Sequence, residues 1–269
     1  SGATLPEYIE VSAIDSFNTT YTRGIQRIRY DHIPNQILLP EVSLKAVPIN
    51  LEIAGKEVGY IMGAGDDVPE AIRRMGYKVT ELKETDIQFA SLKKFDAVVI
   101  GIRAYNTHPW LFAKKPELKK FMENGGNVIV QYNTANFLSG GLSAMDSVGI
   151  YPMKVGRDRV TVENAPVTIL APKHPALNYP NVITEADFKY WVQERGLYYP
   201  SEWNSKYTAL ISMADPNEPK QDGAILVAKV GKGNYVYTGI SFFRQLPAGV
   251  PGAYRLFANL LSLGKQKTK

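Results

Sequence analysis

Two short runs of polar side chains follow apolar segments of this sequence, at places where buried strands would end. The first run comes after AVVIGI and the second after NVIV. Their guanidinium, amide and phenol groups donate and accept hydrogen bonds, which suits a hydroxyl-rich or anionic ligand. The alternative is that these groups pair with one another and with neighbouring loops. The residues are Arg103, Tyr105, Asn106, Gln131, Tyr132 and Asn133.

The turn after NVIV carries no reactive nucleophile. The chain contains no cysteine, and it is the thiolate form that makes a cysteine side chain nucleophilic. Gln131 and Asn133 are neutral amides, and a phenol such as that of Tyr132 ionises only at about pH 10. The sequence therefore excludes thiolate catalysis at this turn and predicts binding.

A second group of polar and aromatic residues lies in segments 187–196 and 241–249. An aromatic face beside guanidinium, amide and carboxylate groups is typical of a sugar site, and Trp191 is the predicted stacking face. The alternative is that both segments are packed loops with internal salt bridges. The candidate residues are Asp187, Trp191, Glu194, Arg195, Arg244 and Gln245.

Asp187 and Glu194 also suggest a different function, since two carboxylates can hydrolyse a glycosidic bond. The sequence gives no separation between them, so a carbohydrate-active hydrolase remains an alternative to binding. Three other motifs point to no activity. The histidines lack the spacing of metal ligands, Gly141–Met145 is one residue short of a serine-hydrolase elbow, and Gly63–Gly65 is followed by two carboxylates where a pyrophosphate needs free N–H groups.

Composition is ordinary for a globular protein. The chain has 269 residues, with 45% hydrophobic and 21% charged residues and a formal net charge of +5. Basic residues are scattered in pairs instead of forming one face, so we expect no nucleic-acid partner. No apolar run approaches the roughly 18 residues of a membrane span. The 16 tyrosines favour a surface that binds sugars.

Alternating strand and helix patterns predict a doubly wound, mostly parallel sheet over residues 51–269. Residues 1–50 lack a helical period and predict a β-rich arm or linker leading from an upstream domain. We expect a helix that an Asp caps after Gly65 and that ends at Gly76. Residues 183–199 are expected to form a short helix or loop. The terminal helix should place Tyr254, Phe257, Leu260 and Leu261 on one face.

Several long motifs in order resemble one known family. RYDHIP, VGYIMGAGDDVPEAIRRMGY, FDAVVIGIRAYN, NGGNVIVQYNT, ADFKYWVQERGLYYPSEW and GISFFRQLPAGVPGAYRLFANLL are similar to the C-terminal region of large bacterial PIG-L/LmbE-type N-acetylglucosaminyl deacetylases. That region is a class I glutamine-amidotransferase-like domain. It also resembles the ThuA-like branch. The resemblance implies a flavodoxin-like fold, a carbohydrate or amino-sugar ligand, an upstream deacetylase domain as partner, and export to the periplasm or the outside of the cell.

The departures from that family matter as much. The deacetylase zinc signature A-H-P-D-D-E has no counterpart, because Trp110 follows His108-Pro109 and Ala176 follows His174-Pro175. The amidotransferase cysteine and its His-x-Glu partner are also missing. We therefore expect no cofactor in this chain, with zinc confined to the deacetylase domain. The expected function is a non-catalytic accessory domain, with a hydrolase or a structural, oligomerising domain as alternatives.

Overall fold

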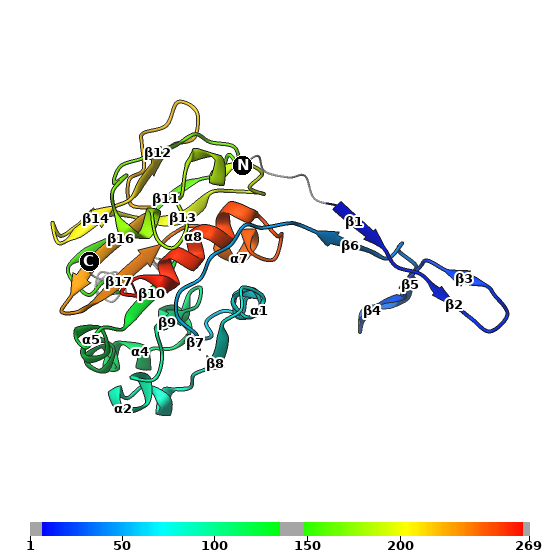
Figure 1. Cartoon of the computed structure of the whole chain (residues 1–269), viewed down its shortest axis with the longest axis horizontal. Coiled ribbons are helices and arrows are strands. Elements are labelled where there is room, and N and C mark those ends of the chain that lie inside the picture. Colours follow the sequence, from blue (N-terminus) through cyan, green and yellow to red (C-terminus); the bar gives the residue numbers. More distant parts are fainter. Residues whose placement is uncertain (1–6, 135–147, 266–269) are drawn as a thin grey trace. The chain divides into compact units, whose positions relative to one another are not determined.

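The computed structural model describes residues 7–134 and 148–265, and it divides the chain into two units, residues 1–49 and 50–269. The Gly141–Met145 motif lies outside the described residues. The first unit is a series of two-stranded ribbons (Figure 1). Its strands are β1 (Glu7–Glu10), β2 (Ala13–Ile14), β3 (Thr20–Tyr21), β4 (Gln26–Tyr30), β5 (Ile33–Leu38) and β6 (Ser43–Ala46).

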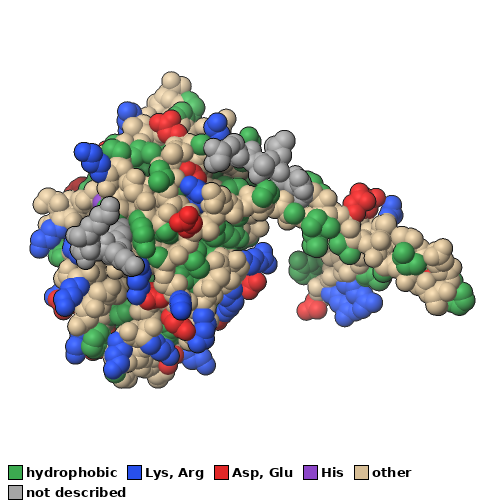
Figure 2. Space-filling view, viewed as in Figure 1, with side chains coloured by type: hydrophobic (Ala, Val, Ile, Leu, Met, Phe, Trp, Pro, Cys, Tyr) green, Lys and Arg blue, Asp and Glu red, His purple; other side chains and the backbone are tan. Residues whose placement is uncertain are grey.

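This first unit has no interior of its own. None of residues 8–49 is buried, and large apolar side chains such as Phe17 at 89% and Ile14 at 65% exposure face solvent. Figure 2 shows these hydrophobic groups along the ribbon. Two paired strands have no second layer to cover their faces, so a ribbon alone buries little. The predicted N-terminal β extension is confirmed.

The second unit is built on a seven-stranded sheet in the order β14-β16-β17-β10-β9-β7-β8. Strands β8, β7, β9, β10 and β17 run parallel, and β16 pairs antiparallel with both β17 and β14. The expected doubly wound sheet is confirmed. The strands are β7 (Glu57–Ile61), β8 (Lys78–Glu81), β9 (Ala97–Ile100), β10 (Asn127–Gln131), β14 (Tyr207–Ala209), β16 (Ile225–Val230) and β17 (Gly233–Thr238).

Helices cover both faces of this sheet, which explains why its central strands are apolar throughout. Leu118, Phe121 and Met122 of α5 pack in one cluster with Val98 and Ile100 of β9. On the other face α8 contacts β10. The helices are α1 (Val68–Arg74), α2 (Phe89–Leu92), α3 (Ala104–Thr107), α4 (Trp110–Ala113), α5 (Lys115–Glu123), α7 (Phe242–Gln245) and α8 (Pro251–Ser262).

Smaller elements lie outside the seven-stranded sheet. β11 (Met153–Val160) pairs antiparallel with β13 (Gly196–Trp203), and β12 (Val167–Ile169) with β15 (Ile211–Met213). The 3₁₀ turns are η1 (Glu84–Asp86), η2 (Pro175–Leu177) and η3 (Glu185–Phe188). The expectation of a short helix or loop over 183–199 is therefore only half right, because its last four residues begin strand β13. Pairing with β11, distant in sequence, decides that strand.

Local expectations for the helix ends hold with one refinement. Gly76 has φ +104 after α1, as a left-handed helix stop requires. The carboxylate that binds the start of α1 belongs to Asp66, whose Oδ1 accepts from Val68 N at 3.0 Å, whereas Asp67 makes no capping hydrogen bond. The expected apolar face of α8 is confirmed, since Tyr254, Phe257, Leu260 and Leu261 are all buried.

Candidate functional site

The strand order places a switch point between β7 and β9, where doubly wound sheets often bind ligands. In this protein that crevice is filled by the chain itself. Ala64 N donates to Ile102 O at 2.9 Å, and a side chain at Gly63 would clash with the same carbonyl. Close backbone approach explains Gly63, and Asp66 Oδ1 already accepts from the helix N–H of Val68, which a pyrophosphate would need.

A buried polar network lies beneath this closed crevice. Gln131 Nε2 donates to the Tyr60 hydroxyl at 3.0 Å, and that hydroxyl donates to Asp66 Oδ1 at 2.7 Å. Burial raises the pKa of Asp66, although the hydrogen bonds from Tyr60 and Val68 N oppose the shift. Burial also raises the pKa of Tyr60 well above its usual value. Gln131 is fully buried and links β10 to β7, so it is a structural residue here.

The amides at the ends of β9 and β10 pair with each other. Asn106 Nδ2 donates to Thr134 O and its Oδ1 accepts from Thr134 N, both at 2.9 Å. Asn133 Oδ1 accepts from Tyr105 N at 3.0 Å, and its Nδ2 donates to Gln131 O at 2.9 Å. The alternative of mutual pairing therefore holds for these amides. They lock the two strand ends together.

Arg103 and Tyr132 differ from those amides. Arg103 is exposed and has a left-handed backbone with φ 56, while its N–H donates to Tyr132 O at 2.8 Å. The Tyr132 ring stacks on Tyr198 with centroids 5.6 Å apart and touches Phe243 at 5.5 Å. Burial raises the pKa of Tyr132, and the nearby guanidinium groups of Arg103 and Arg244 oppose that shift. Two cations therefore flank an aromatic group.

Arg244 joins this group through an ion pair with Glu194. Its Nε donates to Glu194 Oε1 at 2.8 Å, and its Nη1 donates to Gln193 Oε1. Ser241 Oγ also donates to Glu194 Oε1, at 3.2 Å. Arg244 and Glu194 are only partly buried, at 39% and 17% side-chain exposure. We define the strand-end site as Arg103, Tyr132, Tyr198, Glu194, Phe243 and Arg244.

The sequence predicts that Gln245 contacts a ligand, but the structure places it elsewhere. It is fully buried, and its amide accepts from Val192 N at 2.9 Å while donating to Val192 O and Glu194 O. An amide that satisfies three backbone groups shapes the loop before β13 and has no free group for a ligand. The expectation for Gln245 is corrected to positioning of Glu194.

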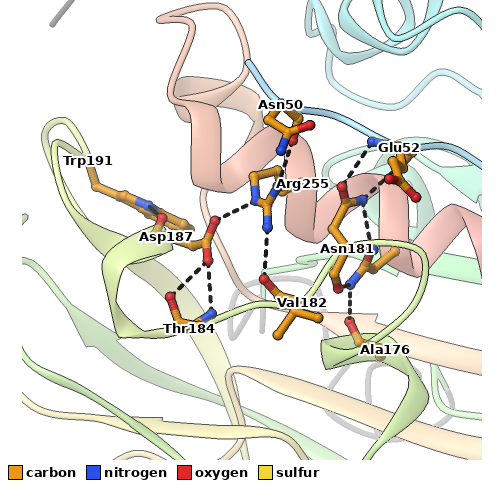
Figure 3. A network of polar contacts seen from close by, with 10 residues as sticks. Asn50, Glu52, Ala176, Asn181, Val182, Thr184, Asp187, Trp191 and Arg255 are labelled. Atoms are coloured by element: carbon orange, nitrogen blue, oxygen red, sulfur yellow. Dashed lines mark hydrogen bonds and ion pairs between the residues drawn. The ribbon is translucent and has the colours of Figure 1, made fainter. Parts of the chain in front are cut away.

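Asp187 and Trp191 are also held inside the protein (Figure 3). Asp187 Oδ1 accepts from Arg255 Nε at 2.8 Å, and its other oxygen accepts from Thr184 N at 2.8 Å. Trp191 donates its indole N–H to Asp187 O at 2.9 Å and is only 3% exposed. A ring that is buried has no face left for a sugar, so the stacking expectation for Trp191 is wrong in this structure.

The carboxylates of Asp187 and Glu194 have separate basic partners, Arg255 and Arg244. A glycosidase pair would share one substrate bond between them. Because each carboxylate is bonded to its own arginine, nothing in the described residues favours the hydrolase alternative.

A cleft of about 710 Å³ adjoins these residues, between segments 163–167 and 185–191. Tyr190 stands on its edge, 62% exposed and with a left-handed φ of 61. Arg195 borders it from inside and is 3% exposed, and burial lowers the pKa of Arg195 to about 10. The sequence predicts Trp191 as the stacking residue and not its neighbour Tyr190. In an irregular loop, exposed and buried residues follow no fixed period, so the sequence does not show which of the two rings faces solvent.

Residues 7–134 and 148–265 give no support for a metal site or a membrane-spanning helix. These residues contain no group of three or more His, Cys, Asp or Glu side chains that could hold a metal ion. None of their helices is both long and apolar enough to cross a membrane. Figure 2 shows Lys and Arg side chains scattered over the visible face of the 50–269 unit rather than gathered in one block.

No protein-family model matches this chain, and no curated protein matches it. Solved structures do. A ThuA-like protein from Bacteroides uniformis is 14% identical, with 83% of this chain and 97% of that chain covered and a TM-score of 0.51. PurLQS from Thermotoga maritima is 12% identical, with 78% and 99% covered and a TM-score of 0.50. A GMP synthase component from Thermoplasma acidophilum is 10% identical, with 80% and 96% covered and a TM-score of 0.48.

At such low identities the likeness shows the fold alone. The second unit is a mixed α/β domain of the flavodoxin type, and the ThuA-like protein and PurLQS are among its structural neighbours. This confirms the predicted fold class. None of these three neighbours is named as a PIG-L/LmbE-type deacetylase, so a link to those enzymes belongs to the proposal below.

Proposed function

We propose that this protein is a non-catalytic binding domain that takes a hydroxyl-rich ligand, a carbohydrate or an amino sugar, at the strand-end site. The observation that supports it is the half-buried ring of Tyr198, which stacks on the buried Tyr132 beside the exposed Arg103 and the ion pair Glu194–Arg244. Aromatic faces pack against sugar rings, and forked guanidinium and carboxylate groups bind hydroxyls in pairs.

The chemistry of the site favours binding over turnover. Thiolate attack needs a cysteine, and the chain has none. The phenol of Tyr132 is held in its neutral form, since burial raises its pKa. The carboxylate of Glu194 already accepts from Arg244 and Ser241, which lowers its value as a general base. These features support a binding role for the strand-end site over proton transfer.

The partner in this proposal is a deacetylase domain of the PIG-L/LmbE type. The support is the resemblance of the ordered motifs between about residue 25 and residue 264. In that arrangement the present domain would hold the sugar chain while the zinc-dependent deacetylase acts on it. The same resemblance is the basis for proposing an exported protein.

A thermal-shift screen against amino sugars, N-acetyl sugars and short glycans tests the binding proposal. A ligand that binds only the folded protein at a hundredfold excess over its Kd stabilises it by about 2.7 kcal/mol. We expect the shift to disappear in Arg103→Ala and in Arg244→Ala. Arg73→Ala is the matched control, because Arg73 is an exposed arginine on α1 with an ion pair to Glu70.

The outcomes separate cleanly. A shift that Arg73→Ala keeps and Arg103→Ala loses places the ligand at the strand-end site. A panel without any shift, or a shift that survives both Arg103→Ala and Arg244→Ala, would overturn the proposal.

A further inference from the structure

The cleft between segments 163–167 and 185–191 has a lining of mixed character. It contains the exposed ring of Tyr190 and four charged side chains, two of each sign. The charged residues are Glu163, Glu185, Lys189 and Arg195. A volume of about 710 Å³ lies within the range of small-molecule sites, roughly 300–1,000 Å³. The cleft is therefore large enough for one or two sugar rings.

Tyr190 is the first unusual feature of this cleft. It holds a left-handed backbone at φ 61 and leaves 62% of its surface in solvent. A non-glycine residue in that region is strained, and such strain persists where surrounding structure enforces it. The next residue, Trp191, is anchored by its indole, which donates to Asp187 O at 2.9 Å. The loop thus presents an aromatic face to the cleft at a conformational cost.

Arg195 is the second unusual feature. Its Nε and Nη2 donate to Ala165 O at 3.2 and 2.7 Å, and its Nη1 donates to Phe188 O at 2.6 Å. A guanidinium has five N–H groups, so one on each terminal nitrogen has no bond to a described residue. Within ranges 7–134 and 148–265 no carboxylate lies within ion-pair distance of Arg195, in contrast to Arg244 and Arg255.

Glu163 acts on this buried cation electrostatically, but no carboxylate of the described residues forms an ion pair with it, so Arg195 can still attract an anion in surroundings where desolvation strengthens the interaction of opposite charges. Two N–H groups on neighbouring nitrogens match the two oxygens of one carboxylate. The carboxylates of Glu163 and Glu185 at the cleft would repel a phosphate dianion more strongly than a single negative charge. Together with the ring of Tyr190, these features favour a sugar with one negative charge over a phosphate.

We infer that this cleft is a second ligand site, which takes a pyranose ring that carries a carboxylate. The ring stacks on Tyr190 and the carboxylate bonds to Arg195. None of the strand-end residues lines this cleft, so the inference does not depend on the proposed function. An acidic polysaccharide could then contact the domain at two places.

Binding of glucuronic acid to the full chain, followed by ligand-observed NMR and thermal shift, tests the inference. Glucose is the neutral counterpart, and acetate and inorganic phosphate are the simple anions. We expect glucuronic acid to bind at least about tenfold more tightly than glucose, and Tyr190→Ala to weaken it about tenfold. Tyr30→Ala is the matched control, because Tyr30 is also exposed at 60% and lies in the other unit.

Arg195→Lys tests the carboxylate contact and should remove the preference of glucuronic acid over glucose. Because Arg195 also joins two loops, this variant is accepted only if its denaturation midpoint stays near that of the parent protein. Tyr190→Ala remains decisive otherwise, since that side chain is exposed.

Three results would overturn the inference: equal binding of glucuronic acid and glucose, no binding of either, or glucuronic acid binding unchanged in Tyr190→Ala. Arg103→Ala distinguishes the two sites. If it abolishes glucuronic acid binding while Tyr190→Ala does not, the strand-end site holds the acid and the cleft does not. If Arg103→Ala leaves glucuronic acid binding intact, the acid does not bind at the strand-end site. The strand-end site is then tested by the thermal-shift screen described above.

Discussion

The ring of Tyr132 stacks on that of Tyr198 with centroids 5.6 Å apart and planes inclined by only 17°. Tyr132 directly follows β10, and Tyr198 belongs to β13, which is outside the main sheet. The stack therefore connects the β11–β13 strand pair to the carboxyl end of the main sheet. It also joins the polar residues of two segments that are far apart in sequence.

Replacing Tyr198 by Ala should destabilise the protein by about 1 kcal/mol, the typical value of an aromatic pair. Tyr190→Ala is a close control, because Tyr190 is a second tyrosine with a left-handed backbone, φ 61 against φ 55, and is mostly exposed. Urea denaturation of both variants measures the difference. Equal loss in both would show that the backbone position, and not the stack, determines stability.

The pKa of Asp66 predicts a pH dependence of stability. Burial raises that pKa above the ordinary 3.8, so the folded state holds its proton more strongly than the unfolded state. The free energy of unfolding therefore contains a contribution that is complete below about pH 3.8 and is lost as pH rises through the folded pKa. In Asp66→Asn this loss should vanish.

The comparison is made by urea denaturation from about pH 3.5 to about pH 7, taking the difference between Asp66→Asn and the parent protein. Asp31→Asn is the control, because Asp31 is exposed and is not among the groups that shift the pKa of Asp66. A difference that stays constant with pH would contradict the raised pKa.

A buried polar contact joins Asn259 of α8 to Asn181, in the segment after η2; Asn181 and Ala176 are labelled in Figure 3. Asn259 Oδ1 accepts from Asn181 N at 2.9 Å, and its Nδ2 donates to Asn181 O at 2.7 Å and to Ala176 O at 3.0 Å. Asn259→Leu leaves these groups buried without partners, which should cost about 3 kcal/mol or more. Asn50→Leu, at an exposed position, should change stability by less than about 0.5 kcal/mol.

Denaturant midpoints measure both asparagine variants. A small effect of Asn259→Leu would mean that water reaches the contact and replaces the lost hydrogen bonds.

Residues 50–269 should fold without residues 1–49. The second unit contains the whole seven-stranded sheet and its helices, whereas none of residues 8–49 is buried. We expect the shortened chain to keep its cooperative unfolding and its denaturation midpoint within a few degrees. Heat denaturation followed by circular dichroism measures this, and loss of cooperativity would contradict it.

The same ribbon should promote association, since contiguous exposed apolar surface is rare on monomers. Light scattering after size exclusion should therefore find the full chain more self-associated than residues 50–269. If both proteins have the same number of chains per particle, the ribbon does not cause association. That result would also weaken the alternative that this protein is a structural, oligomerising domain.

The sequence by itself determined the main sheet and showed that the turn after β10 carries no reactive nucleophile. Near-continuous apolar runs such as AVVI and NVIV require helices on both faces, and that pattern depends only on local order along the chain. The absence of cysteine excluded thiolate catalysis without any structure. Glycine stops such as Gly76 are also local, since they depend on the backbone of a single residue.

Only the tertiary structure decided which polar residues are available to a ligand. Three residues have side chains typical of a sugar site but are already bonded within the protein. Asp187 pairs with Arg255, Trp191 donates to a backbone carbonyl, and Gln245 bonds to the loop before β13. Arg103, Tyr198 and Tyr190 remain accessible to different degrees because their neighbours are already satisfied or lie elsewhere. Hydrogen-bond partners come from segments up to a hundred residues or more apart, as in Asn133 N and the Tyr237 hydroxyl, and no sequence period records such pairings.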